Sequence, residues 1–313
     1  MIGKKLKVII YGFGRMGLTH YAILNHLIEN AEFVFVDPDR KVNFFAKKNI
    51  NAKILNSDKD LKDAFDFGLI CTPPMFHIPI LEKLINQKCK KIFVEKPFGG
   101  IKDDFTHLIN SKHNITVGYV LRFNPIIQWI KEHIDLNEIL CVNGYYYSNT
   151  IEKKPKGWRN GSFSGVSNEV GAHIVDLCVY LFGLSNPALI DKQSFSVISD
   201  VDDIMIANLE EKSIKYHLHF DWVNKSYRKP VFKFIISMKD GTEIKFDQQK
   251  VEHYERDILL KRITSVDLAQ KVPFYLRGVE FTKQMQDFTS KQDIIANVND
   301  ALITRNLIKK LLS

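Results

Sequence analysis

The sequence predicts an α/β protein of two domains. The first is a doubly wound parallel sheet, and the second is an α+β domain with a large open, mostly antiparallel sheet. Three observations carry this prediction. The first third alternates apolar runs with amphipathic segments, a glycine-rich turn follows the first apolar run, and residues 188–251 read as strand after strand. A chain of 313 residues is also too long for one comfortable hydrophobic core.

The strand-like runs of the first third are short, apolar and evenly spread. Continuous apolar strands that alternate with amphipathic helices indicate a parallel sheet covered on both faces. Helix-like segments such as 15–30 and 73–88 separate the runs. The predicted strands are 6–12, 32–37, 52–55, 67–72, 91–96 and 115–120.

After Val120 the pattern changes to a helix at 124–133 and then to alternating strands with turn signals between them. Frequent alternation is typical of an antiparallel sheet with one covered face. The strands are expected at 194–199, 203–210, 213–222, 231–238 and 242–247, and two helices at 275–289 and 298–312. We therefore expect a dinucleotide-binding domain over 1–120 and a substrate-binding and oligomerisation domain over 121–313, with the C-terminal helix able to pack back on the first domain.

Composition narrows the class of protein. The formal net charge is +8, but the lysines are scattered and no basic cluster interleaved with aromatics indicates nucleic-acid binding. No apolar run reaches membrane-spanning length, and the N-terminus lacks the features of a signal peptide. A cytoplasmic location is therefore expected. The four cysteines have no metal-binding or redox spacing and are expected to be buried thiols.

A glycine motif follows the first predicted strand and opens a helix. Gly12, Gly14 and Gly17 have the G-x-G-x-x-G spacing, which permits a tight turn, a close approach to a pyrophosphate and close helix packing. The helix N-terminus supplies free N–H groups for phosphates. The dinucleotide-contact candidates in this loop are Gly12, Phe13, Gly14, Arg15, Met16 and Gly17. The alternative is a simple glycine turn before a helix.

Asp37 ends the second predicted strand, 20 residues after Gly17. A carboxylate at this place accepts hydrogen bonds from ribose hydroxyls and repels a 2′-phosphate, which favours NAD over NADP. Arg40 lies close enough to weaken that discrimination, so NADP remains the alternative cofactor.

Lys96 ends the fifth predicted strand in VEKPFGG, and CTPP (71–74) ends the fourth. Ligands of open parallel sheets bind beyond the carboxyl ends of the strands, so both segments are predicted to face the ligand. The cofactor candidates here are Cys71, Thr72, Pro73, His77, Glu95 and Lys96. The alternative for Lys96 is a surface lysine paired with Glu95.

The segment 167–183 reads as one helix. In that reading Glu169, His173 and Asp176 share a face beside an apolar stripe. Catalysis is the favoured interpretation, structural hydrogen bonding is the second, and a metal site is the third, because no further His and acid cluster completes a coordination set. No metal is expected.

Six motifs then carry a resemblance that spans nearly the whole chain. GFGRMG, CTPPMFH, VEKPFGG, GYVLRFNP, WRNG and NEVGAHIVD occur in the order seen in the glucose-fructose oxidoreductase and inositol dehydrogenase family (Gfo/Idh/MocA), which this chain resembles. The resemblance implies an N-terminal Rossmann domain and a C-terminal domain whose open sheet often packs against another subunit. It also implies substrate contact by Lys96 and commonly a cis bond before Pro97.

The family's D-x-G-x-H-x-x-D pattern corresponds to Glu169, Gly171, His173 and Asp176, with Glu in place of the first Asp. Some members that act on nucleotide-linked or amino sugars look similar to this form. The chain is therefore predicted to transfer a hydride between NAD (or NADP) and a secondary alcohol or ketone of a sugar, polyol or nucleotide-linked sugar. An anionic substrate would suit the positive charge.

In the predicted mechanism His173 is the base, Glu169 orients it, and Lys96 hydrogen-bonds the reacting oxygen. The substrate-contact candidates are Tyr119, Arg122, Trp158, Arg159 and Asp176. The alternatives within the resemblance are an NAD-retaining glycosidase and a non-catalytic regulator that senses a dinucleotide. A homodimer or homotetramer through the second sheet is expected, because its apolar face needs cover.

Overall fold

The computed structural model describes residues 5–59, 61, 63–100, 103, 105–108, 113–290 and 294–313, apart from the side chains of Phe45 and Thr106. The chain divides into two compact units. The first unit contains Met1–Val120 and Val272–Asn299, and the second contains Leu121–Lys271 and Asp300–Ser313. The first boundary falls where the strand pattern of the sequence changes, but the later segment 272–299 returns to the first unit.

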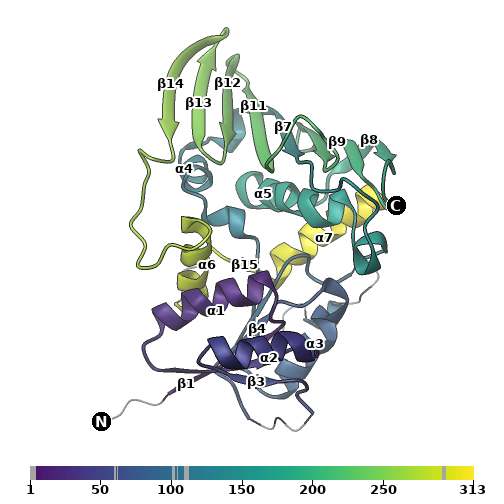
Figure 1. Cartoon of the computed structure of the whole chain (residues 1–313). Coiled ribbons are helices and arrows are strands. Elements are labelled where there is room, and N and C mark those ends of the chain that lie inside the picture. Colours follow the sequence, from purple (N-terminus) through teal and green to yellow (C-terminus); the bar gives the residue numbers. More distant parts are fainter. Residues whose placement is uncertain are drawn as a thin grey trace. The chain divides into compact units, whose positions relative to one another are not determined.

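The first unit is built on a seven-stranded sheet in the order β15-β6-β5-β4-β1-β2-β3 (Figure 1). All pairs are parallel except the short β15, which runs antiparallel to β6. Since β2 and β4 flank β1 on opposite sides, the order of the strands reverses there, and such switch points bind ligands. The strands are β1 (Leu6–Tyr11), β2 (Ala31–Val36), β3 (Lys53–Leu55), β4 (Phe67–Ile70), β5 (Lys91–Val94), β6 (Asn114–Val117) and β15 (Ala296–Asn297).

Helices cover this sheet and explain why its strands are continuously apolar. Val8, Ile9 and Ile10 in β1 are completely buried, as expected for a strand between two helical layers. Helices α1 and α6 pack against each other. The helices are α1 (Arg15–Leu27), α2 (Arg40–Asn49), α3 (His77–Asn86) and α6 (Val279–Thr289), with short 3₁₀ turns at Pro74–Phe76 and Thr106–Leu108.

The second unit is built on an eight-stranded sheet in the order β14-β13-β12-β11-β7-β10-β9-β8. Its neighbouring strands are antiparallel except for β7 and β10, which are parallel. The predicted mostly antiparallel sheet is thus confirmed. The strands are β7 (Ile139–Tyr147), β8 (Ala188–Phe195), β9 (Ile204–Glu211), β10 (Ile214–Asp221), β11 (Val231–Met238), β12 (Thr242–Asp247), β13 (Lys250–Glu255) and β14 (Ile258–Thr264).

The two faces of this second sheet differ. Leu218, Phe220 and Phe234 are completely buried, and helix α5 packs on β7 of the same sheet (Figure 1). The approach is close, because a Cβ at Gly144 of β7 would lie 2.9 Å from Ile174 Cγ2. The helices of the unit are α4 (Pro125–His133), α5 (Ala172–Phe182) and most of α7 (Val298–Leu312), with short turns at Val120–Phe123, Leu136–Glu138, Gly157–Asn160 and Ser167–Gly171.

The opposite face carries half-exposed side chains, Tyr145, Tyr147, His217 and His219 among them. The Tyr147 hydroxyl lies 3.0 Å from His219 Nδ1, and the Tyr145 and Tyr147 rings are 5.8 Å apart. This face is therefore lined by aromatic rings that carry polar hydroxyl and imidazole nitrogen groups. Such rings suit a surface that is partly exposed to solvent.

One predicted strand of the second unit is wrong. The run at 194–199 was expected to be a strand, but β8 ends at Phe195 and the following residues form a loop. The cause is Asp203, whose carboxylate accepts the backbone N–H groups of Val197, Ile198 and Ser199. These groups are no longer available for a ladder. Strands β13 and β14 were not predicted, because polar residues interrupt their apolar pattern.

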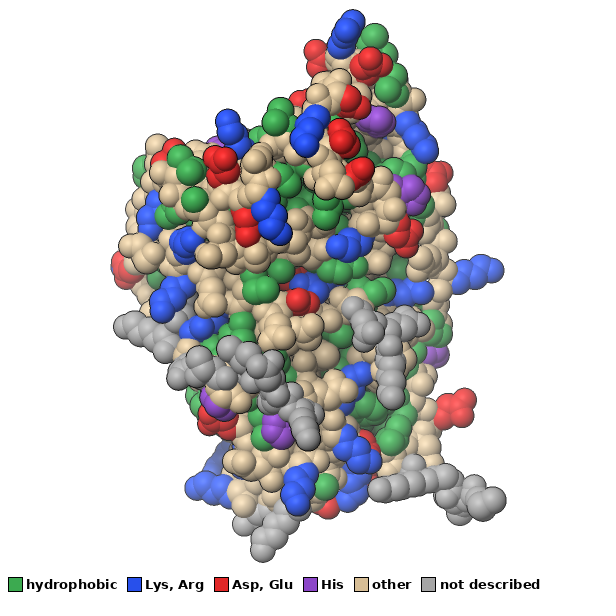
Figure 2. All heavy atoms as spheres, turned by 180° about the vertical axis from the view of Figure 1, so that it is seen from behind, with side chains coloured by type: hydrophobic (Ala, Val, Ile, Leu, Met, Phe, Trp, Pro, Cys, Tyr) green, Lys and Arg blue, Asp and Glu red, His purple; other side chains and the backbone are tan. Residues whose placement is uncertain are grey.

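Charges of both signs are mixed on the one face that Figure 2 shows. On the face shown in Figure 2, the blue lysine and arginine side chains lie among red acidic ones rather than in a single patch. Among the residues that the structure describes, no helix combines the length and the apolar character needed to cross a bilayer.

Candidate functional site

The glycine loop joins β1 to α1 and has little space for side chains at two of its three glycines. Gly12 adopts φ +92°, and a Cβ there would lie 2.7 Å from the Cys71 carbonyl oxygen. A Cβ at Gly17 would overlap the Gly12 carbonyl oxygen. Gly14, the residue before α1, has open space in the direction of its absent Cβ. The loop is therefore tightly packed at Gly12 and Gly17 and open at Gly14, where a ligand would approach.

Asp37, the residue after β2, is hydrogen-bonded to this glycine loop. Phe13 N–H donates to Asp37 Oδ2 (2.8 Å), and Asp39 N–H donates to Asp37 Oδ1 (2.9 Å). The Gly12 N–H donates to the Val36 carbonyl (2.9 Å), so the ends of β1 and β2 are joined twice. A carboxylate oxygen accepts more than one hydrogen bond, and Asp37 is only half-buried, so it keeps capacity for a hydroxyl.

These features fit a dinucleotide. The first turn of α1 has no side-chain cap and no acidic residue, so its N–H groups and the positive end of the helix dipole suit a pyrophosphate. Arg15 is exposed and Met16 half-buried at this helix start, whereas the Phe13 ring packs 4.9 Å from Phe35 inside the unit. Phe13 can thus offer its backbone to a ligand but not its ring.

Two further loops lie at the carboxyl ends of β4, which pairs with β1, and of β5, the next strand beyond β4. Cys71, Thr72 and Pro73 follow β4 and are half-buried. Burial raises the pKa of the Cys71 thiol well above its usual value, so this thiol is not a nucleophile at neutral pH. Lys96 follows β5 and is half-buried, and the Lys96–Pro97 peptide bond is cis, as the resemblance implied.

Two buried histidines support these loops. His77 Nε2 lies 2.8 Å from the Thr72 carbonyl, and its Nδ1 lies 2.9 Å from the Pro97 carbonyl. His20 on α1 contacts Glu95, with Nε2 2.6 Å from Oε1. His77 was a cofactor candidate from the sequence, but its ring is completely buried. His20 was missed, because a lone histidine on the inner face of a helix resembles an ordinary core residue.

In the second unit, the segment of Glu169 and His173 starts with an irregular turn. Ser167–Gly171 form a π-turn, and the α-helix begins only at Ala172. A π-turn has one residue more per turn than an α-turn, so the α-helical spacing predicted for Glu169 and His173 does not hold there. Such turns are frequent at functional sites. Gly171 within it is required, because a Cβ would lie 2.5 Å from Phe220 Cδ2.

Glu169 contacts two side chains of its own unit. The buried Ser164 hydroxyl donates to Glu169 Oε1, and Arg159 Nε lies 3.7 Å from Glu169 Oε2. The Arg159 guanidinium also lies over the Trp158 ring, 5.4 Å from its centroid. Three of the predicted site residues are therefore neighbours, and Arg159 remains about half exposed, with 52% of its side-chain surface accessible.

Arg122 and Asp176 form a buried ion pair. Arg122 Nη2 donates to Asp176 Oδ1 (2.7 Å), Nε donates to Oδ2 (2.9 Å), and Nη1 donates to Asp300 (2.8 Å). Burial by itself would lower the pKa of the Arg122 guanidinium, but the two carboxylates raise it above its usual value. Both residues were predicted as substrate contacts. The structure shows that their polar atoms bind each other and Asp300, which the sequence did not indicate.

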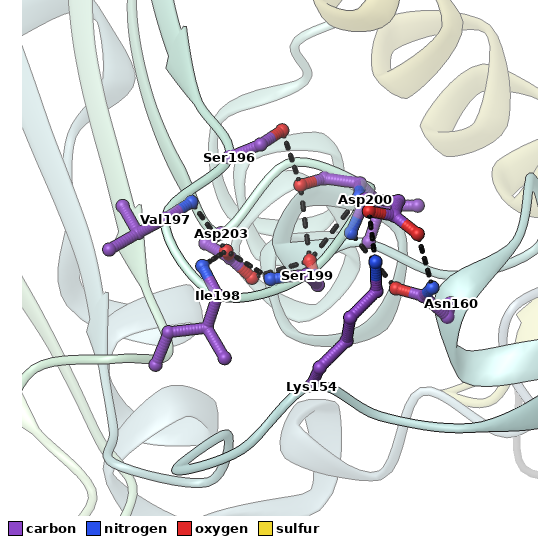
Figure 3. A network of polar contacts seen from close by, with 9 residues as sticks. Lys154, Asn160, Ser196, Val197, Ile198, Ser199, Asp200 and Asp203 are labelled. Carbon is purple, nitrogen blue, oxygen red and sulfur yellow. Dashed lines mark hydrogen bonds and ion pairs between the residues drawn. The ribbon is translucent and has the colours of Figure 1, made fainter.

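A loop at 196–203 forms a network of polar contacts within itself and with Lys154 and Asn160 (Figure 3). Asp200 accepts from Lys154 Nζ and Asn160 Nδ2, both at 2.6 Å, and so holds the two ends of the segment that includes Trp158 and Arg159. Asp202 accepts the Ser167 N–H (2.9 Å) at the start of the π-turn.

Asp203 is the internal support of this loop. Its carboxylate is completely buried and accepts from three backbone N–H groups, the Ser199 hydroxyl and Trp222 Nε1. Although burial favours the protonated form, these hydrogen bonds lower the pKa of Asp203 below its usual value. None of the three aspartates was a candidate from the sequence.

The predicted site residues are thus divided between the two units. The glycine loop, Asp37, the β4 and β5 loops and the buried Tyr119 belong to the first unit. Glu169, His173, Trp158, Arg159, Arg122 and Asp176 belong to the second unit. Within the described part of the chain, no three histidine, cysteine or acidic side chains lie together as metal ligands would.

Comparison with protein families gives one match. The model of an oxidoreductase family with an NAD-binding Rossmann fold (GFO_IDH_MocA) matches residues 6–114. This range begins with β1 and ends at the start of β6, so it includes the glycine loop, Asp37 and Lys96. Comparison with curated proteins finds no match.

Solved structures share the fold over the full length. A levoglucosan dehydrogenase in complex with NADH and levoglucosan has a TM-score of 0.81 at 15% identity, covering 99% of this chain and 96% of that chain. The UDP-N-acetylglucosamine 3-dehydrogenase GnnA from Acidithiobacillus ferrooxidans has a TM-score of 0.73 at 16% identity, with the same coverage. A dehydrogenase (MviM) from Clostridium difficile has a TM-score of 0.73 at 16% identity and covers 99% of both chains.

Proposed function

We propose that this chain, whose residues 6–114 belong to the Gfo/Idh/MocA oxidoreductase family, is an NAD-dependent dehydrogenase or reductase of a sugar, a polyol or a nucleotide-linked sugar. The observation that carries the proposal is the glycine loop, open at Gly14 and held by the Asp37 carboxylate at the Phe13 N–H. That arrangement suits a pyrophosphate on α1 and a ribose at Asp37.

The cofactor would supply a hydride acceptor or donor, and the chain would supply its binding site. The N–H groups at the start of α1 would bind the phosphates, and Asp37 would accept from the ribose hydroxyls. The loops at Cys71–Pro73 and Glu95–Lys96 lie at the carboxyl ends of β4 and β5, the two strands that follow β1 on one side of the sheet, and ligands of such sheets bind beyond these ends.

The proton chemistry is assigned to three side chains. His173 would take the proton of the secondary alcohol, because an imidazole titrates near neutral pH. Lys96 would hydrogen-bond a reacting oxygen and stabilise its negative character. Glu169 would hold the positive charge of the imidazole, and its own position is supported by Ser164 and Arg159.

The substrate class follows from Trp158 and Arg159. An indole face suits stacking on a sugar ring, and a half-exposed guanidinium suits a carboxylate or a phosphate. The sugar substrates named for the neighbouring dehydrogenases support this class. Tyr119 remains a proposed contact. Arg122 and Asp176 bind each other, so we propose that they stabilise α5 rather than contact the substrate directly.

Assembly is proposed from the second sheet. Its aromatic face with Tyr145, Tyr147 and His219 is half-exposed, and a second copy of the chain would cover it. We expect a homodimer or homotetramer, which light scattering at micromolar concentration would detect. A stable monomer of the composition mass, 36.2 kDa, would contradict this expectation. Location in the cytoplasm stays a prediction from the sequence.

The function is tested by incubating the purified protein with NAD and a panel of sugars, polyols and nucleotide-linked sugars. NADH absorbance and glycoside release are followed together. The proposal expects NADH to accumulate with at least one substrate. Glycoside release without net NADH would identify an NAD-retaining glycosidase instead, and NAD binding without any turnover would favour a dinucleotide-sensing regulator.

A further inference from the structure

The two chain neighbours of Lys96 are each bound by a histidine that is completely buried. Glu95 precedes Lys96 and contacts His20, and Pro97 follows it and contacts His77. Both histidine side chains have 0% of their surface exposed. A buried imidazole costs desolvation energy that an apolar ring of the same size would not. The placement of both rings on the same short segment therefore needs an explanation.

His20 connects Glu95 to the helix of the glycine loop. It lies on the inner face of α1, and its ring packs edge-to-face on Phe93 of β5, with ring centroids 4.9 Å apart. The Glu95 carboxylate is confined on its other side, because a Cβ at Gly118 would lie 3.2 Å from Oε2. Glu95 is therefore held between α1 and the end of β6, and the backbone that enters Lys96 is held with it.

His77 connects the loops that follow β4 and β5. Its two nitrogens face the carbonyl oxygens of Thr72 and Pro97 at 2.8 and 2.9 Å. A carbonyl oxygen only accepts hydrogen bonds, so both contacts are hydrogen bonds when the ring carries both protons, and a neutral ring donates to one of them. Burial lowers the pKa of His77, although both carbonyls and Glu95 oppose that shift.

We infer that His20 and His77 are positioning residues that fix the backbone on either side of Lys96 and thereby aim its ammonium group. The inference rests on the proposed function, in which Lys96 acts on the reacting oxygen. The side chain of Lys96 starts from this backbone, so a shift of the backbone would displace it, and a misplacement of about 1 Å can cost on the order of a hundredfold in rate. Neither histidine touches the substrate in this account.

The first test is a double-mutant cycle. His20→Phe and His77→Phe keep the ring volume and remove the hydrogen bonds, and each is made in the wild-type chain and in Lys96→Ala. Each should lower kcat about tenfold in the wild-type chain, with NAD affinity changed much less, and should have almost no effect on the residual rate of Lys96→Ala. His77→Gln, which restores a donor, should recover part of the loss, and it also replaces His77→Phe if that variant does not fold.

His26→Phe is the matched control, because His26 lies on the same α1 helix and stacks on Phe274 at 5.0 Å. It should leave kcat unchanged. Equal losses from the two histidine variants in both backgrounds would overturn the inference and leave the proposed role of Lys96 intact. Normal turnover in Lys96→Ala alone would overturn that role, and the inference with it.

A second measurement needs no substrate. Reductive methylation followed by peptide mass spectrometry reports how readily each lysine amine reacts. Lys96 should react several-fold faster or slower in His20→Phe and His77→Phe. Lys91, at the start of the preceding strand β5 and hydrogen-bonded to the Ser290 carbonyl at 2.8 Å, should not change. An unchanged rate at Lys96, or an equal change at Lys91, would contradict the positioning role even if no active substrate were found.

Discussion

Two segments of this protein carry its proposed chemistry, and they are held in opposite ways. In the first unit, the neighbours of Lys96 are held by two buried histidines, and two of the three acceptors are backbone carbonyls. In the second unit, the segments around Trp158 and Glu169 are held by the aspartates of loop 196–203, which accept backbone and side-chain N–H groups.

The difference has a physical consequence. In the first unit, two of the three acceptors are uncharged carbonyl groups and only Glu95 is a carboxylate. In the second unit, Asp200 and Asp203 act as acceptors in their ionised form, because hydrogen bonds lower the pKa of both carboxyls, so their support depends on pH. The second unit should therefore be the part of the protein that acid weakens first.

The largest expected effect is on Asp203. Asp203→Ala removes the acceptor of five donors, and each buried donor left unpaired costs about 1–3 kcal/mol, with water reaching some of them. We expect a loss of about 4 kcal/mol in the free energy of unfolding, measured by urea denaturation at pH 7. Because the pKa of Asp203 is lowered, its contribution is present above the unfolded pKa and disappears as the pH falls through the folded value.

The control for this variant is Asp191→Ala, on the exposed surface of β8. It removes a carboxylate that accepts a hydrogen bond from a side-chain amide, Asn208 Nδ2 at 2.7 Å. Its effect should be below about 1 kcal/mol. If Asp203→Ala were as mild as this control, the loop would not depend on its internal carboxylate, and the comparison between the two kinds of support would fail.

The next effect concerns turnover and compares one residue from each unit. Lys96→Ala and His173→Ala should each lower turnover on the order of a hundredfold to a thousandfold, because each is proposed to interact with charge that changes during the reaction. NAD affinity, measured by calorimetry, should change far less. Lys91→Ala is the matched control on β5 and should keep normal turnover. Near-normal turnover in Lys96→Ala would make that residue an ordinary surface lysine.

A smaller effect of opposite sign is expected at Asp202. Burial raises the pKa of this carboxyl to about 6, so the folded protein binds its proton more tightly than the unfolded chain does. Its contribution to stability is therefore greatest at low pH and is lost as the pH rises through about 6. Asp202→Asn keeps an acceptor for the Ser167 N–H and should be more stable than the wild type at pH 7.5 by up to about 3 kcal/mol.

Urea denaturation at pH 5 and pH 7.5 distinguishes this effect from a general one. The gain of Asp202→Asn over the wild type at pH 5 should be about half of the gain at pH 7.5, because pH 5 lies between the unfolded and the folded pKa of Asp202. A gain of the same size at both pH values would mean that the change improves packing rather than removing a buried charge. A loss at both values would mean that the carboxylate is needed by the start of the π-turn.

The sequence predicted those parts of the site that depend on residues close together in the chain. The glycine spacing, the strand before it and Asp37 lie within one short stretch, and each has the position in the fold that its pattern predicts. The partners of those residues could not be read, because they are distant in the chain. Glu95 and His20 are 75 residues apart, and Arg122 and Asp300 are 178 apart. A spacing rule has no access to such pairs.

The irregular segments were missed for a different reason. The helix prediction assumed 3.6 residues per turn throughout 167–183, and the π-turn at Ser167–Gly171 breaks that period. The strand prediction at 194–199 assumed that apolar alternation decides the backbone, whereas Asp203 takes the N–H groups that a strand needs. In both cases a local hydrogen-bonding demand overrides the periodic signal.

The smallest expected effect is that of changing Asp37. This residue belongs to the first unit, but its carboxylate accepts backbone N–H groups, as the aspartates of loop 196–203 do in the second unit. Its carboxylate accepts the N–H groups of Phe13 and Asp39 and would also face the ribose. A 2′-phosphate at about 4 Å from such a charge is repelled by about 1 kcal/mol in a water-like medium, so NAD should bind roughly five- to tenfold more tightly than NADP. Calorimetric titration of both cofactors measures the ratio.

Asp37→Asn should reduce that preference toward unity, because the amide keeps an acceptor for Phe13 and loses the charge. Arg40→Ala should do the reverse and widen the gap, since Arg40 is an exposed cation at the start of α2 that can approach the same phosphate. If NADP bound as tightly as NAD in the wild-type protein, Arg40 would outweigh Asp37. The carboxylate would then serve only the backbone of the glycine loop, as the aspartates of loop 196–203 serve theirs.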